Sequence, residues 1–181
     1  MITDLKYTHS DLLEMPDDGK RREIVDGEVY VAPSPLSSHQ RILGNLAYAF
    51  WKFLEAHPLG ELLVSPMDVI LSAHDVLAPD LLFISNEHRD YVQDWVRGAP
   101  DLVIEILSPA SKVRDRGIKS KAYARYGVRE YWIVDPTAEV IEVYRLTERG
   151  FELAAKRAKD AVVETPLLPG FCLLVDSIFP A

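Results

Sequence analysis

The segment "LVIEIL" at residues 102–107 limits the folds open to this chain more than any other part of the sequence. A short, unbroken apolar run of this kind is typical of a strand that is buried on both faces of a sheet. Glu105 interrupts the run, and an ionised carboxylate in an apolar interior costs several kcal/mol unless a cation, a metal ion or hydrogen bonds compensate for it. The pattern therefore predicts that Glu105 has a partner or marks a point where the core opens to solvent.

Strand and helix patterns alternate along the rest of the chain. The segment "REIVDGEVYV" (22–31) is typical of a hairpin, because its Asp26-Gly27 turn tolerates positive φ angles. Helices are predicted over 8–15, over 37–56 and from about 111 to 126, the last ended by Gly127. Strands are predicted over 61–64, 67–71, 81–84, 102–107, 130–136, 139–146, 151–154 and 162–165, with a polar loop before Gly98 and an apolar tail docked on the core. This order predicts one α/β domain over residues 1–181, with a mixed central β-sheet flanked by helices.

The charge of the chain is unevenly distributed. The net charge of −8 argues against a protein that coats nucleic acid by bulk charge. Residues 112–129 nevertheless contain seven basic residues and one acidic residue. A phosphodiester substrate would favour such a basic helix beside carboxylates, whereas the alternative is a helix that is only solvated or that pairs with acids of a partner subunit. The candidate nucleic-acid-binding residues are Lys112, Arg114, Arg116 and Lys121.

Other features narrow the class of protein. Cys172 is the only cysteine, which excludes an intrachain disulfide and a cysteine-rich zinc site. The first residues lack the basic segment and apolar stretch of a signal peptide, and no apolar run approaches the length of a membrane span. We therefore expect a cytoplasmic protein with no membrane partner.

Two acidic residues and a lysine can be brought together by this arrangement. Asp80 directly precedes the strand predicted over 81–84, and Glu105 lies inside the next buried strand, so the two carboxylates meet if the strands are neighbours. Carboxylate oxygens are hard ligands that suit Mg²⁺ or Mn²⁺. Asp115, Lys119 and Tyr123 are four residues apart and share one stripe of a helix that can aim them at Glu105. Glu105 would then be neutralised by a metal ion and by Lys119.

Several longer segments carry a family pattern. They are "REIVDGEVY", "SSHQRILGNLAYAF", "APDLLFI", "GAPDLVIEILSPAS" and "DRGIKSKAYARYGVREYWIVDP", and together they span nearly the whole chain. The combination resembles the Uma-type family of restriction endonucleases, within the PD-(D/E)XK nuclease superfamily. The resemblance implies a restriction-endonuclease-like α/β fold and hydrolysis of phosphodiester bonds in DNA with Mg²⁺ or Mn²⁺ as cofactor. The alternative is a non-catalytic nucleic-acid-binding or accessory module that keeps the fold and the acids.

The resemblance also implies roles for individual residues. Asp80 matches the acid of the Pro-Asp element, and Glu105 matches the second acid of the motif. Leu107 stands where the superfamily has its lysine; in this family the lysine comes from the following helix, where Lys119 matches and Lys121 does not. The implied catalytic residues are Asp80, Glu105 and Lys119, and the implied metal ligands are Asp80, Glu105 and the backbone carbonyl of Ile106.

The implied chemistry leads to two further expectations. Lys119 would orient or deprotonate the attacking water, or stabilise the charge that builds up in the transition state. Lys121 is turned about 200° from Lys119 on the helix, so it is expected to face solvent or the nucleic-acid backbone. Cutting both strands of a duplex would need two such sites, which points to a homodimer.

The same residues also have structural interpretations. Asp80 could cap a turn, Lys119 could be a solvated helix lysine, and Glu105 could pair with one of the arginines at 114 and 116. Asp101 also follows a proline, but it lies on the same strand as Glu105 at a distance of roughly 13 Å. We therefore interpret Asp101 as the residue that starts this strand and not as a ligand.

Three residues are candidates for supporting roles. His39 lies near the start of the helix over 37–56, where it could face inward or simply be hydrogen-bonded at the helix start. Glu23 matches a recurrent acidic position of the family, and it could support the metal ligands or serve as a third one. Tyr123 is expected to be a packing residue whose hydroxyl group reaches the edge of the site.

Overall fold

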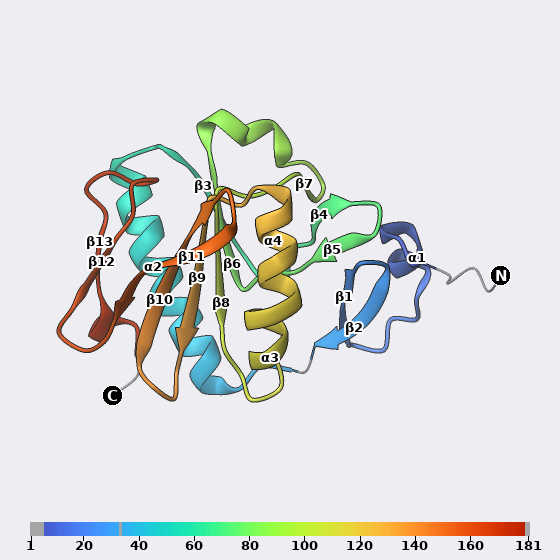
Figure 1. Ribbon diagram of the computed structural model, residues 1–181, viewed down its shortest axis with the longest axis horizontal. Helices are drawn as coiled ribbons and strands as arrows, with labels where there is room; N and C mark the ends of the chain where they lie inside the picture. The colour runs from blue at the N-terminus through green and yellow to red at the C-terminus, as the bar shows by residue number, and fades with distance from the viewer. Residues whose placement is uncertain (1–5, 33, 180–181) are drawn as a thin grey trace.

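A six-stranded β-sheet forms the centre of the computed structural model, which describes residues 6–32 and 34–179 (Figure 1). In spatial order the sheet contains β11 (Gly150–Arg157), β10 (Val140–Thr147), β9 (Glu130–Asp135), β8 (Leu102–Ile106), β6 (Leu81–Ser85) and β3 (Gly60–Val64). β8 and β9 are parallel, and the other four neighbouring pairs are antiparallel. The α/β chain with a mixed central sheet is confirmed, and β6 and β8 are neighbours in it.

One helical segment connects β8 to β9 and packs on one face of this sheet (Figure 1). It consists of α3 (Lys112–Arg114), a π-helical turn η2 (Asp115–Lys119) and α4 (Ser120–Tyr126), and it ends at Gly127 with a φ of 91°. The helix predicted over 111–126 is therefore confirmed in position, but its middle turn is wider than an α-helical turn. π turns are rare and are frequent at functional sites.

The helix α2 (Ser37–Ala56) covers the opposite face of the sheet. Its bounds are those predicted, and Leu46 and Phe50 are fully buried in the core that it shares with the sheet. The C-terminal segment completes this layer with β12 (Val162–Glu164), β13 (Cys172–Leu174) and η3 (Val175–Ser177). Phe171 and Ile178 are buried in the same core, so the docking predicted for the apolar tail is confirmed.

A second, five-stranded sheet lies beside the helical segment of α3, η2 and α4, here called the crossover helix (Figure 1). In spatial order it contains β2 (Glu28–Ala32), β1 (Arg21–Val25), β5 (Asp75–Leu77), β4 (Val69–Ser72) and β7 (Val96–Arg97). The predicted hairpin is present as β1–β2, and its turn residues Asp26 and Gly27 have φ angles of 52° and 83°. The strands β5 and β7 were not predicted, because two or three residues are too few to show a period.

Two short helices complete the described chain. α1 (His9–Glu14) lies within the helix predicted over 8–15, and Thr8 and Asp11 cap its start by reciprocal hydrogen bonds. η1 (Asn86–Tyr91) occupies part of the segment predicted as a polar loop.

Candidate active site

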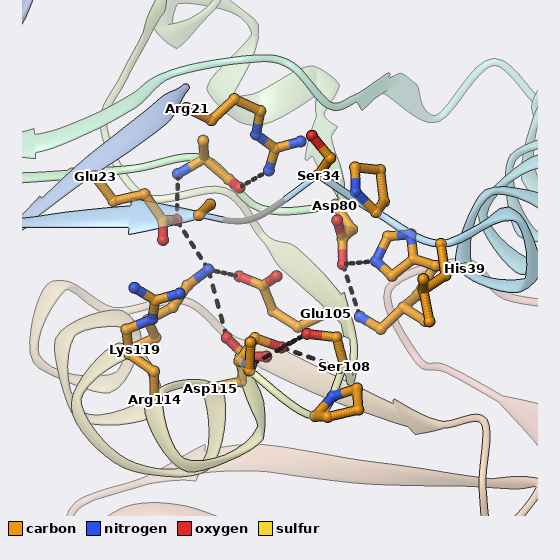
Figure 2. A pocket seen from close by; sticks show the side chains of 18 residues that line it. Arg21, Glu23, Ser34, His39, Asp80, Glu105, Ser108, Arg114, Asp115 and Lys119 are labelled. Carbon is orange, nitrogen blue, oxygen red and sulfur yellow. Dashed lines mark hydrogen bonds and ion pairs between the residues drawn. The ribbon is translucent and has the colours of Figure 1, made fainter. Parts of the chain in front are cut away.

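The candidate site forms where β6 begins and β8 ends. The two strands are antiparallel with Leu81 opposite Ile104, so Asp80, directly before β6, lies beside the last residues of β8. Side chains alternate along β8, which places Ile104 in the core under α2 and turns Glu105 and Leu107 toward the crossover helix. Glu105 is thus buried between the sheet and the helical turn that carries Lys119 (Figure 2).

Asp80 is held in place by two donors that come from different layers. Its Oδ2 atom accepts a hydrogen bond of 2.8 Å from the backbone N–H of Ile106 and lies 3.0 Å from Nε2 of His39 (Figure 2). The ladder between β6 and β8 ends at Leu81, and the Asp80 side chain takes over the next N–H of β8. His39 faces the site from α2, and its Nε2 must carry the proton in order to donate to the carboxylate.

Glu105 is held by the helix. Its Oε1 atom lies 2.6 Å from Nζ of Lys119 and accepts a hydrogen bond of 3.0 Å from the Tyr123 hydroxyl group. The predicted approach of Lys119 to Glu105 is confirmed, and the pairing of Glu105 with an arginine at 114 or 116 does not occur. Lys121 is exposed, as predicted from its angle on the helix.

Lys119 is shared among three acids. Besides Glu105, its ammonium group contacts Oε1 of Glu23 at 2.9 Å and Oδ1 of Asp115 at 3.7 Å, and only 4% of its side chain is exposed. Glu23 also accepts a hydrogen bond of 2.9 Å from the backbone N–H of Ala78, which fixes its carboxylate between β1 and the segment before β6. The solvated-lysine interpretation of Lys119 is therefore wrong.

Burial and charge shift the pKa values of this cluster in a consistent direction. Burial lowers the pKa of Lys119, but the carboxylates of Glu105, Glu23 and Asp115 outweigh burial and raise it above its ordinary value. Burial raises the pKa of Glu105 well above its usual range, and the Lys119 ammonium offsets only part of this. Burial also raises the pKa of Asp115. Lys119 therefore stays an ammonium group, and the acids around it favour additional positive charge.

The acids at this site offer ligands suited to a divalent cation. Asp80 and Glu105 line a cavity of about 280 Å³, and in each carboxylate one oxygen accepts no hydrogen bond from the described residues. Within 6–32 and 34–179, no set of three or more His, Cys, Asp or Glu side chains is arranged to hold a metal ion. The donor set fits Mg²⁺ or Mn²⁺, because Mg²⁺ is commonly bound through one or two carboxylates while waters and substrate phosphates supply the remaining oxygens. Ile106, whose carbonyl was predicted as a ligand, lines the same cavity.

The predicted nucleic-acid-binding residues have separate surroundings. Arg114 lines the cavity. Lys112 and Arg116 instead contact acids of the sheet, since both lie within ion-pair distance of Asp135 and Arg116 also binds Glu142. The basic face of the helix thus pairs in part with acids of its own chain, a possibility beyond the two alternatives that the sequence left open.

Arg21 is a cavity-lining residue that the sequence did not single out. It lies on β1, two residues before Glu23, and therefore on the same face of that strand. Its position depends on the pairing of the hairpin with β5 and on the contact of Arg21 with Ala78 in the segment before β6, which no local pattern reveals. The only local signal was the spacing of two residues from Glu23, which places both side chains on the same face of a strand.

Comparisons with known proteins identify the family of this chain. The model of the Uma2 family, described as "Putative restriction endonuclease", matches residues 9–176. The chain belongs to the Uma2 family. A relative of this Uma2 protein, the "Uncharacterized protein slr1290" of Synechocystis sp., is 26% identical over 135 residues, which cover 72% of the chain and 69% of the relative.

The fold of this Uma2 protein recurs in the crystal structure of a "putative nuclease belonging to DUF820" from Anabaena variabilis. The two structures have a TM-score of 0.79 and 20% sequence identity, and the match covers 95% of this chain and 97% of the other. The predicted restriction-endonuclease-like fold is confirmed by this likeness. None of the helices in the described part of the chain is long and apolar enough to cross a membrane.

Proposed function

We propose that this Uma2 protein is a Mg²⁺- or Mn²⁺-dependent nuclease that hydrolyses phosphodiester bonds in DNA. The observation that supports this most directly is the 2.6 Å contact of Lys119 with Glu105, beside Asp80 on the neighbouring strand. Two carboxylates with free oxygens and one ammonium group around a single cavity suit metal-assisted phosphoryl transfer. The description of the family and that of the Anabaena structure name nucleases as well.

Asp80 and Glu105, together with the carbonyl of Ile106, would hold the ion. When bound, the ion would polarise the phosphoryl group and lower the pKa of a water molecule. His39 and the Ile106 N–H keep the Asp80 carboxylate in one orientation, and the Tyr123 hydroxyl does the same for Glu105. These contacts occupy only one oxygen of each acid and leave the other oxygen available.

Lys119 would act as a cation. Hydrolysis joins a water oxygen to phosphorus and breaks the bond from phosphorus to one ester oxygen. The water loses a proton, the departing oxygen gains one, and negative charge is spread over the phosphoryl oxygens in between. Because the carboxylates around Lys119 raise its pKa, its side chain keeps its proton at neutral pH. Lys119 is thus placed to orient the water or to stabilise the developing charge by hydrogen bonds.

The second candidate function is a non-catalytic nucleic-acid-binding or accessory module. Two observations favour it: the net charge of −8 and the position of Leu107, which fills the place of the usual lysine. Both functions predict nucleic-acid binding, but only the nuclease requires metal binding at Asp80 together with strand cleavage.

A metal titration followed by a cleavage assay tests the proposal. A ligand that binds only the folded state at one hundred times its Kd stabilises that state by about 2.7 kcal/mol, so Mn²⁺ should raise the Tm of the wild type. Asp80→Asn should abolish both this shift and the cleavage of plasmid DNA. Asp90→Asn, an exposed acid in η1, is the matched control and should change neither.

Two outcomes would contradict the nuclease. A Tm shift that persists in Asp80→Asn would place the metal elsewhere, and metal-independent DNA binding without cleavage would support the accessory module.

Cleavage of both strands of a duplex requires two sites, so we extend the proposal to a homodimer. Sedimentation analysis would measure the mass of the assembly.

A further inference from the structure

Two arginines line the cavity without an acidic partner. Arg21 comes from β1 and Arg114 from the end of α3, and Figure 2 shows their guanidinium groups on different sides of the Lys119 ammonium group. Neither lies within ion-pair distance of a carboxylate in the described chain, although four acids line the same cavity. Other arginines of the described chain do pair with acids; they include Arg22, Arg116, Arg125, Arg129 and Arg145.

Backbone contacts hold the two guanidinium groups in place. Nη2 of Arg21 lies 3.5 Å from the carbonyl oxygen of Ala78, and Nη1 of Arg114 donates to the carbonyl oxygen of Val31 at 3.2 Å. The Arg114 guanidinium also lies over the Tyr30 ring, 5.7 Å from its centroid. Both arginines are thus anchored by the five-stranded sheet and its hairpin. Their partners there are uncharged, so neither guanidinium charge is neutralised.

Each of these arginines also has a buried donor without an acceptor. Four buried side-chain atoms of the described residues lack a hydrogen-bond partner, and three of them belong to residues that line this cavity: Nε of Arg21, Nε of Arg114 and Nδ1 of His39. A buried polar group without a partner is costly, so each case calls for an explanation. In the tautomer whose Nε2 donates to Asp80, Nδ1 of His39 is an acceptor and would not bind an anion. The two arginine Nε atoms are donors, so they are the unpaired atoms that could bind one.

The charge of the cavity shows why the binding of an anion there would require these two side chains. Its charged lining residues are four acids, Lys119 and the two arginines. Lys119 is already bound by three of the acids, so without the arginines the cavity would repel a phosphate group. The planar guanidinium group of arginine donates two parallel hydrogen bonds and matches the oxygens of phosphate.

We infer that Arg21 and Arg114 form a phosphate-binding subsite beside the Glu105–Lys119 cluster. The inference rests on the proposed function for its substrate class, and the ligand is a phosphate group of a nucleic-acid strand next to the one that is cleaved. The five-stranded sheet, which supplies or anchors both arginines, would then have the role of positioning the strand, while the six-stranded sheet and the π turn supply the reacting groups.

Binding without turnover tests the subsite. A fluorescein-labelled single-stranded oligonucleotide, with or without a 5′-phosphate, is titrated in EDTA at several salt concentrations against the wild type, Arg21→Gln, Arg114→Gln and the double variant. Arg149→Gln, an exposed arginine in the turn after β10, is the control for the loss of one charge. Because the two arginines share one phosphate group, the double variant should reduce the slope of log K against log salt by about 0.7, the value for one phosphate contact on a single strand, and each single variant by part of this. Arg149→Gln should leave the slope unchanged.

The same titrations identify the kind of phosphate group that is bound and test whether the subsite exists. Arginine-dependent binding of both oligonucleotides indicates an internal phosphodiester, and binding of the 5′-phosphorylated one alone indicates a terminal phosphate; either supports the subsite. Equal slopes for the wild type and the double variant would overturn it. If a Gln variant fails to fold, the Arg21→Lys or Arg114→Lys variant replaces it. Lysine keeps the charge but not the paired donors of arginine, so these variants should keep the slope and bind the oligonucleotide several-fold more weakly.

Failure of the subsite can be distinguished from failure of the nuclease. If the arginine variants lose binding but no metal supports cleavage by the wild type, the subsite stands and the proposed reaction fails. If the wild type cleaves DNA and the arginine variants bind and cleave it unchanged, the reaction stands and the subsite fails.

Discussion

Two buried acids stand at opposite ends of β8, and their surroundings differ. Asp101, directly before the strand, accepts hydrogen bonds from the Ser85 N–H at 2.8 Å and from Arg129 at 3.2 Å, and His88 lies 3.1 Å from both of its oxygens. Glu105, near the other end, uses one oxygen for Lys119 and Tyr123 and leaves the other without a donor in the described chain. The same type of group is fully satisfied at one end of the strand and half satisfied at the other.

The pKa values of the two acids move in opposite directions as a result. Burial raises the pKa of Asp101, but hydrogen bonds from Ser85 and His88 outweigh burial and hold it below its ordinary value. Burial raises the pKa of Glu105, and Lys119, which also serves Glu23 and Asp115, compensates only in part. Asp101 is therefore a structural acid and Glu105 has the features of a functional one, since strongly shifted groups in cavities are functional candidates.

The largest expected difference between the two ends concerns turnover. Lys119→Ala should reduce the rate of DNA cleavage by about 10²–10³-fold, the usual cost of losing one group that stabilises transition-state charge. Metal binding should remain, because Asp80 and the free oxygen of Glu105 are unchanged. Single-turnover assays below the Tm of the variant measure this effect. Lys121→Ala is the matched control on the same helix, and a comparable loss of rate there would contradict the assignment of Lys119.

The next largest effect concerns stability at the other end of the strand. Asp101→Asn should lower the free energy of unfolding by about 2–3 kcal/mol, because the buried side chain loses charge-assisted hydrogen bonds. The cost stays at the lower end because Arg129 and His88 both reach solvent and can be hydrated there. Urea denaturation measures it, and cleavage by the folded variant should equal that of the wild type. A folded but inactive Asp101→Asn variant would remove the distinction between the two ends.

The pH dependence of stability should also differ in sign. Asp101 has a lowered pKa in the folded chain, so its contribution is present above its ordinary pKa of 3.8 and is lost as the pH falls through the folded value. Glu105 has a raised pKa, so the folded chain holds a proton that the unfolded chain releases, and stability falls as the pH rises above 4.5. Each group contributes at most about 1.4 kcal/mol per pH unit.

Urea denaturation in EDTA over a range of pH measures both contributions. Asp101→Asn should flatten the acidic limb of the stability curve, and Glu105→Gln should flatten the limb above the ordinary pKa of glutamate. The assignment of signs is wrong if Glu105→Gln changes only the acidic limb.

Much of the Glu105 end could be predicted from the sequence, because its geometry is local. The approach of Asp80 to Glu105 was predicted on the condition that the two apolar runs form neighbouring strands, which they do. The spacing of Lys119 and Tyr123 on the helix follows from helical periodicity even though the turn is π-helical. The role of Asp101 at the start of the strand also follows from its position, but its partners do not. Ser85 and Arg129 reach it only through the pairing of β8 with β6 and β9.

The contacts made by the five-stranded sheet could not be predicted, although the family resemblance implied a supporting role for Glu23. Glu23 reaches Lys119 because β1 pairs with β5, a strand of three residues that carries no recognisable period. The side chain of Arg21 takes its place through the same pairing. Lys112 and Arg116 counted as free charges in the sequence because their acidic partners lie on β9 and β10, which follow the helix at long range. Contacts within an element were predictable, and contacts that depend on the pairing of distant elements were not.

The smallest expected effect is the most direct test of the difference between the two acids. Glu105→Gln should leave the metal-free free energy of unfolding equal to that of the wild type or raise it by up to about 1 kcal/mol, because a desolvated charge is removed. Lys119 would not be left alone, since Glu23 and Asp115 still contact it. If Glu105 were half of a structural ion pair, the same substitution should instead cost about 3 kcal/mol or more. Urea denaturation of both proteins in EDTA separates these outcomes, and repeating it with Mn²⁺ should reverse their order, because only the wild type keeps the carboxylate that the ion requires.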